Sequence, residues 1–152
     1  MVTLLKRAKA RLQDQIKYVR KIDYLITTDE DVLPDGFVKY AITLKDGGGD
    51  ITTHTSEDGA DWDILIDVII WVQLHKTEAT IIGDDTGNKG VYDIMADVFT
   101  ALDGYYLPNA AGVEYVETAE PVGWEPSELR GDENTSYIQK LKTSMRYVIL
   151  KT

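Results

Sequence analysis

The sequence predicts one α/β (α+β) domain over residues 1–152, with a mixed, largely antiparallel sheet of about four to six strands packed against two main helices. Three observations lead to this prediction. A length of 152 residues is typical of a single domain. Apolar residues alternate along residues 64–74, as in a strand, and recur at helical spacing along 91–102. Contents of 43% hydrophobic and 28% charged residues exclude a disordered or fibrous chain.

The first predicted elements are an amphipathic helix and a short strand. Residues 3–20 should form the helix, because their apolar side chains fall on one stripe and cations surround it. Residues 22–26 follow as a strand, and the acidic stretch 27–36, which contains Pro and Gly, follows as a loop. The helical stripe consists of Leu5, Ala8, Leu12, Ile16 and Val19.

A β-hairpin is expected next. Residues 37–45 form its first strand, the glycine-rich stretch 46–50 its turn, and residues 51–55 its return strand. Residues 56–63 then form a second acidic loop.

The strongest strand and the strongest helix lie in the middle of the chain. Residues 64–74 have one aliphatic face and one half-polar face, which is typical of a central strand. Residues 91–102 show a complete helical stripe. The preceding loop, 83–90, does not match the phosphate-binding pattern, because an extra residue separates Gly87 from Lys89.

The last predicted elements are two strands. Residues 113–118 form the first and residues 141–150 the second, with the long irregular connection 119–132 between them. The expected order along the chain is therefore α-β-β-(β)-β-α-β-β.

Charge is segregated along the sequence. Residues 1–21 have a local charge of +6 and residues 140–151 of +4, whereas residues 22–139 have −20, for a net charge of −10. Such a field repels nucleic acid over most of the surface. The segregation fits either a solvated acidic surface or two partner surfaces of opposite sign.

The sequence offers no support for catalysis. It has no cysteine and 2 histidines, so thiolate chemistry is excluded and a histidine-based site has few candidates. No recognised catalytic or nucleotide-binding motif occurs. We therefore expect no enzyme, no cofactor, no catalytic residue and no metal ligand. Apolar stretches are too short for a secretion signal or a membrane span, so we expect no membrane partner.

Two stretches, 91–107 and 124–147, resemble a known family. The first ends a helix at Leu102-Asp103-Gly104 and continues into a Tyr-rich loop with a proline. The second leads through an acidic connection to a terminal strand that contains Tyr137, Leu141, Met145, Arg146 and Tyr147. Preceded by a basic helix and a hairpin, this order resembles the tail terminator (tail completion) proteins of long-tailed bacteriophages and prophages.

The resemblance implies a structural role in the virion. Family members are small α/β proteins that form a ring, usually a hexamer, on the head-proximal end of the tail tube. The implied partners are further copies of the chain, the tail tube protein and a head or neck connector protein. DNA would pass through the bore without specific binding, and the protein would reside in the host cytoplasm during assembly. No catalytic residues exist to carry over.

Alternatives remain open at this point. The chain could be another neck connector subunit, or an acidic binding or inhibitor module that mimics nucleic-acid charge. An enzyme with an unrecognised carboxylate site, such as Glu125 with Glu128, is a third possibility.

Charged patches and polar loops supply the candidate interface residues. We expect loops 46–50, 56–61 and 119–132 to mediate assembly contacts and to be mobile in the free subunit. We also expect cations of the N-terminal helix or the terminal strand to face an acidic surface of the next copy. The candidate residues are Lys6, Arg7, Lys9, Arg11, Asp46, Asp50, Glu57, Asp58, Asp61, Trp124, Glu125, Glu128, Arg130, Lys142 and Arg146.

Overall fold

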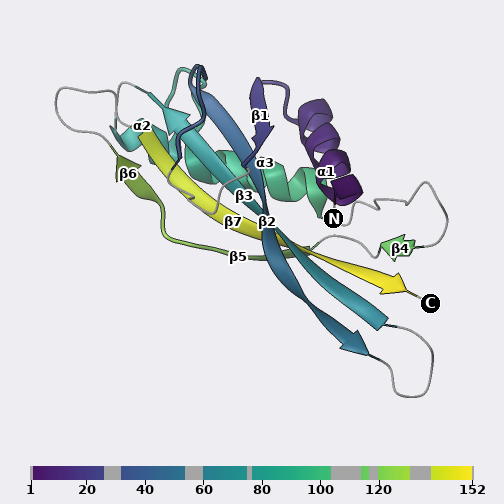
Figure 1. The fold of residues 1–152 in the computed structure, drawn as a ribbon. Helices are drawn as coiled ribbons and strands as arrows, with labels where there is room; N and C mark the ends of the chain where they lie inside the picture. The colour runs from purple at the N-terminus through teal and green to yellow at the C-terminus, as the bar shows by residue number, and fades with distance from the viewer. Residues whose placement is uncertain are drawn as a thin grey trace.

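The computed structural model describes residues 2–25, 32–53, 60–74, 77–103, 114–116, 120–130 and 138–151. Within these residues, three helices pack against an open, seven-stranded mixed sheet (Figure 1). The elements are α1 (Val2–Gln15), β1 (Lys21–Tyr24), β2 (Tyr40–Thr53), β3 (Ala60–Gln73), α2 (Thr77–Ile82), α3 (Val91–Leu102), β4 (Glu114–Val116), β5 (Glu120–Trp124), β6 (Glu128–Arg130) and β7 (Ile138–Lys151). The predicted α+β fold class is confirmed.

Three long strands form the centre of the sheet. β3 lies between β2 and β7 and pairs antiparallel with both, so that Ile70 lies opposite Ile42 on one side and Leu141 on the other. β1 pairs in parallel with β2 at one edge. The short strands β4, β5 and β6 pair antiparallel, one after another, along the outer edge of β7. The sheet is therefore mixed but largely antiparallel, as predicted.

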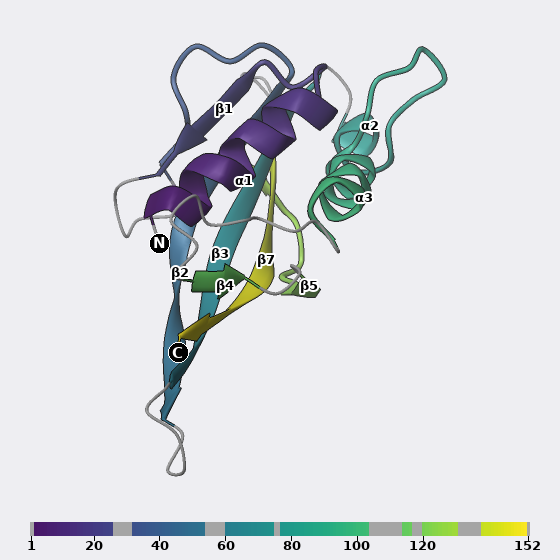
Figure 2. The ribbon, with the colours of Figure 1, turned by 90° about the vertical axis from the view of Figure 1, so that its right-hand side faces the viewer.

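The core lies between the helices and one face of this sheet. α1 packs over β1 and β2, and α3 packs over β3 and β7 (Figure 2). The aliphatic face of β3 is fully buried at Ile66, Val68 and Ile70, and Val98 of α3 is buried against it. Burial of these apolar stripes was the main sequence-based expectation, and it is confirmed. Phe99 is only partly buried beside the core.

The N-terminal helix is shorter than predicted. α1 ends at Gln15, although Ile16 and Val19 are still buried in the core. A turn, in which the Val19 amide donates to the Ile16 carbonyl at 3.2 Å, places these side chains while the backbone already leaves the helix. The apolar spacing therefore continues through the turn and does not mark the helix end.

The predicted turn at residues 46–50 is wrong. β2 continues through this stretch and pairs with β3 on both sides of it. Asp46 lies opposite Ile66 and Gly49 lies opposite Ile64, so one extra residue on β2 forms a β-bulge. The glycines were expected to reverse the chain, but they bend it within one strand. Gly48 has φ +84, which a side chain would strain.

Two further predictions need correction. Residues 60–63, assigned to an acidic loop, belong to β3, while residues 54–59 lie outside the described part of the chain. The connection 119–132 is not irregular throughout, because it contains β5 and β6. Both are short edge strands, and Pro121 is tolerated in β5 because an edge strand needs to donate on one side only.

Two differences concern the element list. Helix α2 was not predicted, since its 6 residues are too short to show periodicity. The last strand begins at Ile138 and not at Leu141. Because β5 and β6 were not predicted, the sheet has seven strands where about four to six were expected.

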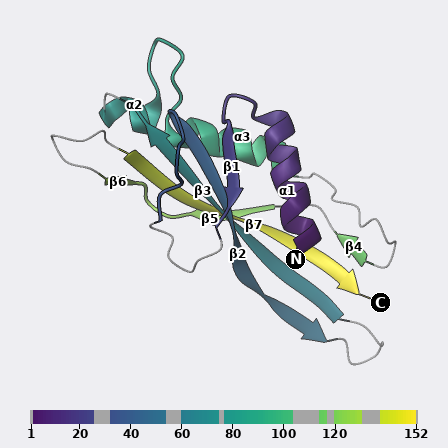
Figure 3. The same cartoon turned by 45° about the horizontal axis from the view of Figure 1, so that its top comes forward.

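One end of the sheet projects beyond the helices. The second half of β2 and the first half of β3 extend past α1 and α3, as Figures 1 and 3 show. We call residues 46–53 of β2 and 60–65 of β3 the arm. The bulge at Asp46 to Gly49 lies at its base.

Candidate interaction surfaces

The outer side of α1 presents cations without an ion-pair partner. Lys6 is exposed and Arg7 is partly exposed, and neither forms an ion pair with any residue that the structure describes. The same holds for the exposed Lys17 and Arg20, which follow the helix. We call Lys6 and Arg7 the α1 cations. They are available for a contact with a partner.

The other two candidate cations of α1 have contacts within the subunit. Lys9 lies 3.5 Å from a carboxylate oxygen of Asp23 and 4.7 Å from the centre of the Tyr24 ring. Arg11 donates its Nε–H to the carbonyl of Ala101 at 2.9 Å, near the C-terminus of α3. A cation there also interacts favourably with the helix dipole. These two side chains fix α1 on the sheet and on α3.

Asp23 sits between two lysines. Lys21, at 3.0 Å, and Lys9 hold the pKa of Asp23 below its usual value, mainly through the hydrogen bond from Lys21. The carboxylate therefore stays charged and holds β1 against α1.

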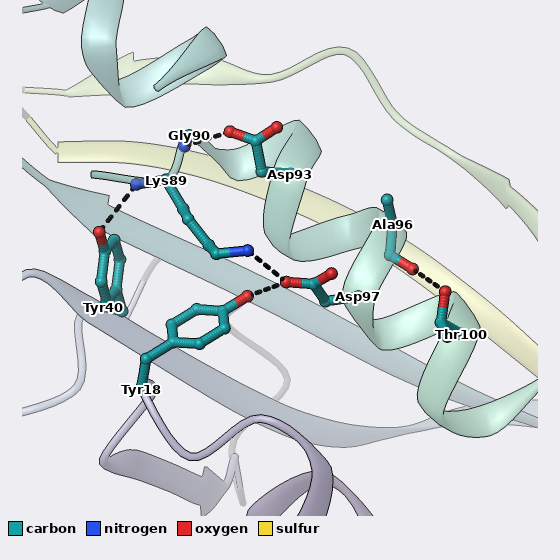
Figure 4. A network of polar contacts seen from close by, with 8 residues as sticks. All are labelled: Tyr18, Tyr40, Lys89, Gly90, Asp93, Ala96, Asp97 and Thr100. Carbon is teal, nitrogen blue, oxygen red and sulfur yellow. Dashed lines mark hydrogen bonds and ion pairs between the residues drawn. The ribbon is translucent and has the colours of Figure 1, made fainter. Parts of the chain in front are cut away.

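A polar network joins the end of α1 to α3 (Figure 4). The Tyr18 hydroxyl donates to Asp97, and Lys89 Nζ lies 3.0 Å from the same carboxylate. The Lys89 amide donates to the Tyr40 hydroxyl at 2.8 Å. Burial, and then the neighbouring Asp97, raise the pKa of Tyr18 above its usual value, so the phenol stays protonated and can donate. The network holds the cationic helix in a fixed orientation.

The two candidate cations of β7, Lys142 and Arg146, are neutralised within the subunit. Lys142 Nζ lies 3.4 Å from Asp67, whose other oxygen accepts a hydrogen bond from Ser144 at 2.6 Å. Arg146 lies 2.9 Å from Asp63 and 3.1 Å from Glu120. These residues form a ladder of alternating charge across the sheet face opposite the helices. Lys142 and Arg146, unlike the α1 cations, thus have acidic partners in their own chain.

Exposed apolar side chains lie beside this ladder on β5. Trp124 is 57% exposed and Val122 56%, and on β6 Leu129 is 41% exposed. A shallow pocket is lined by Val122, Gly123, Trp124, Glu125, Lys142 and Ser144. Among the predicted interface residues, the structure therefore brings Trp124, Glu125 and Lys142 together.

The remaining candidates on β6 form a local pair. Arg130 lies 3.4 Å from Glu128, two residues earlier on the same strand. The two members of the possible carboxylate pair, Glu125 and Glu128, are both exposed, and each lies beside a cation: Glu125 is 3.9 Å from Lys142 and Glu128 is 3.4 Å from Arg130.

The arm presents acids instead of cations. Asp46 and Asp50 are exposed and form no ion pair with a described residue. Asp61 lies on β3 within the arm, and Glu57 and Asp58 lie outside the described residues. The next residue, Ile51, has an apolar side chain that is 63% exposed and lies on the opposite face of β2 from Asp50.

The described residues contain no obvious reactive site. In this part of the chain no group of three or more His, Asp or Glu residues is placed to hold a metal ion. Within the same residues, no helix has the length and apolarity that crossing a membrane requires. The Tyr147 hydroxyl is buried without a hydrogen-bond partner, and burial raises its pKa, but its surroundings are the apolar core.

Sequence reasoning missed several residues that shape these surfaces. Tyr18, Lys89 and Asp97 fix α1, yet Tyr18 and Asp97 lie 79 positions apart, and no local pattern connects them. Ile51 was assigned to an ordinary strand and Val122 to an irregular connection. Their exposure follows from the projection of the arm and from the edge position of β5.

Comparison with known proteins adds one structural similarity. No protein-family model matches the sequence, and no curated protein matches it. Among solved structures, the chain is similar to a protein in the "virion of native gene transfer agent (GTA) particle", over 95% of this chain and 87% of that chain. The sequence identity is 16% and the TM-score is 0.48. At that identity and TM-score the similarity does not assign a function to this chain.

Proposed function

We propose that the protein is a structural component of a phage-type virion, of the tail terminator kind. In this proposal it forms a ring, hexameric as in the family it resembles, on the head-proximal end of the tail tube. The observation that supports it best is the separation of uncompensated charge on one subunit. Among the residues that the structure describes, the α1 cations have no acidic ion-pair partner, and Asp46 and Asp50 on the arm have no cationic one.

Such a subunit is suited to head-to-tail self-association. A contact between two different patches repeats from copy to copy and closes into a ring when the rotation allows. Opposite charges set the register of such a contact, while apolar area supplies most of the affinity. Exposed apolar side chains are present on both the arm and β5, at Ile51 and Val122.

The net charge also suits a ring around DNA. A protein with a charge of −10 repels phosphates over most of its surface, so DNA could pass through the bore without specific binding. In this role the two ends of the ring would contact the tail tube protein and a head or neck connector protein.

Two measurements test the proposed function. The mass of the purified protein, from sedimentation over a range of concentrations, should approach about six times the mass of one subunit. Added to polymerising tail tube protein from the same particle, it should stop tube growth and remain at one end of the tube. A protein that stays monomeric both alone and with the tube protein would contradict the proposal, and a dimer that leaves tube growth unchanged would favour a binding module.

A further inference from the structure

The outer edge of β2 is paired along only part of its length. β1 covers Ala41 to Leu44, and the Leu25 amide donates to the Leu44 carbonyl, which is the last bond of this ladder among the described residues. From Asp46 to Thr53 no described strand pairs with this edge. An open edge of this length exposes unpaired backbone amides and carbonyls, and proteins generally cover or block such an edge.

The direction of this open edge is fixed by the bulge. A Cβ atom on Gly49 would lie 2.1 Å from the Asp63 carbonyl oxygen, so β2 approaches β3 more closely there than any other residue allows. A Cβ on Gly47 would lie 2.6 Å from Asp67 Oδ1. The Gly48 amide donates to Asp46 Oδ1 at 2.8 Å, which closes the bulge. The arm is thus built to project at one angle.

The chemistry of the arm determines what can cover it. No Lys or Arg occurs between residue 46 and residue 75, and residues 46–63 have a charge of −6. Ile51 adds an exposed apolar side chain on the opposite face of β2 from Asp50. Two arms pairing edge to edge would bring acids against acids, which is unfavourable. The occupant should therefore be cationic and should present some aliphatic surface.

We propose that the arm of one copy is covered by α1 of a second copy, with the α1 cations facing Asp46 and Asp50. This inference rests on the proposed function and specifies the contact that joins the subunits. The side chains of Lys6 and Arg7 combine aliphatic stems, which can pack on Ile51, with charged ends that can donate to carboxylates and to free edge carbonyls. Residues 1–21 have a charge of +6 and residues 46–63 a charge of −6, so the two segments are opposite in sign.

The fold favours this occupant over the other cationic candidates. Lys142 and Arg146 already have acidic partners on their own sheet, and Lys9 and Arg11 hold α1 in place. The α1 cations are the ones left on a rigid helix. Because the arm and the outer side of α1 are different patches, the contact is head-to-tail and can propagate around a ring.

Engineered cysteines test the contact directly, because the chain has none of its own. The double variant Asp50→Cys/Arg7→Cys, treated with a short bis-maleimide, should give a ladder of covalent multimers that ends at the closed ring. Asp50→Cys/Val38→Cys is the matched control, since Val38 is exposed but lies outside both patches. Covalent dimers from Asp50→Cys alone would indicate arm-to-arm pairing and would overturn the proposal.

Charge reversal, followed by a compensating substitution, provides the second test. Lys6→Glu/Arg7→Glu should raise the dissociation constant of the contact about tenfold without unfolding the subunit, which circular dichroism checks. Adding Asp50→Lys should restore part of the affinity, whereas Asp85→Lys, on an exposed loop elsewhere, should not. The wild type could form rings while the double cysteine variant does not cross-link and Asp50→Lys does not restore affinity. That result would reject this contact but not the proposed function. A wild type that is monomeric alone and with tube protein would reject the contact and the proposed function together.

Discussion

At Gly49 the neighbouring strand leaves no room for a methyl group. Gly49→Ala would place its Cβ against the Asp63 carbonyl, which is backbone and cannot rotate away. We expect a loss of about 1–3 kcal/mol in the free energy of unfolding, because the strands must separate to accept the side chain. Urea denaturation measures this loss. Asp50→Ala, one residue further along the same strand, is the control and should change stability by less than about 0.5 kcal/mol.

Val98 tests the core at the same scale. It is fully buried between α3 and the sheet, so Val98→Asp would bury a carboxylate without a partner. The expected cost is about 3–5 kcal/mol of unfolding free energy, enough to unfold a marginally stable domain. Thr100→Asp lies on the exposed side of the same helix and should be nearly neutral. Equal losses in the two variants would mean that α3 does not pack as described.

The contribution of Asp84 to stability should depend on pH. Hydrogen bonds from the side chains of Thr86 and Asn88, and then from their amides, lower the pKa of Asp84 to about 2. A carboxylate whose pKa is lower in the folded protein stabilises the fold above the unfolded pKa of about 3.9. That contribution is lost as the pH falls from about 4 towards 2. NMR titration should locate the folded pKa, and Asp84→Ala should flatten the fall of the melting temperature in this pH range. A folded pKa near 4 would contradict the prediction.

At the scale of elements, the sequence predicts helices and strands that have a clear apolar period. It does not predict features that depend on pairing with a distant strand. The stripe of α3 and the alternation of β3 identify both elements, because their period is set by their own backbone geometry. The Gly-rich stretch of β2 is ambiguous, since the same glycines suit a turn or a bulge. Only the pairing with Asp63 and Ile64 decides between them. β5 and β6 are too short to show alternation and exist because β7 offers them an edge.

The polar network between the end of α1 and α3 leads to a prediction about stability. Tyr18→Phe removes the hydroxyl that donates to Asp97, while Lys89 still neutralises the carboxylate. Because the hydrogen bond is partly exposed, we expect a loss of about 0.5–1 kcal/mol in unfolding free energy. Tyr24→Phe is the matched control, since the ring of Tyr24 contacts Lys9 but its hydroxyl forms no hydrogen bond with a described residue. Equal effects in both variants would show that the hydroxyl of Tyr18 contributes nothing.

For the whole molecule, the sequence predicts the sign of the charge on each surface. It does not predict which charged side chains are already paired within the subunit. The sequence locates cations at both ends of the chain and acids between them. It does not show that Arg146 meets Asp63, 83 positions away, and is thereby neutralised. Lys6 and Arg7 look similar in sequence to Lys9 and Arg11, and only the packing of α1 separates exposed cations from those bound inside the subunit.

Salt dependence is the prediction that belongs to the assembled molecule. If the α1 cations meet the acidic arm, the ring should loosen in sodium chloride, because the Debye length falls from ~10 Å at 0.1 M to ~3 Å at 1 M. The loss should be moderate, since each exposed ion pair contributes only ~0–1 kcal/mol and apolar contact supplies the rest. Sodium sulfate at the same ionic strength should loosen the ring less, because it strengthens apolar burial while screening charge equally. Sedimentation of the wild type and of Lys6→Glu/Arg7→Glu in both salts separates the two contributions. The variant should be weaker at low salt and lose its difference from the wild type at 1 M, and an oligomer that responds to neither salt nor substitution would exclude charge from the contact.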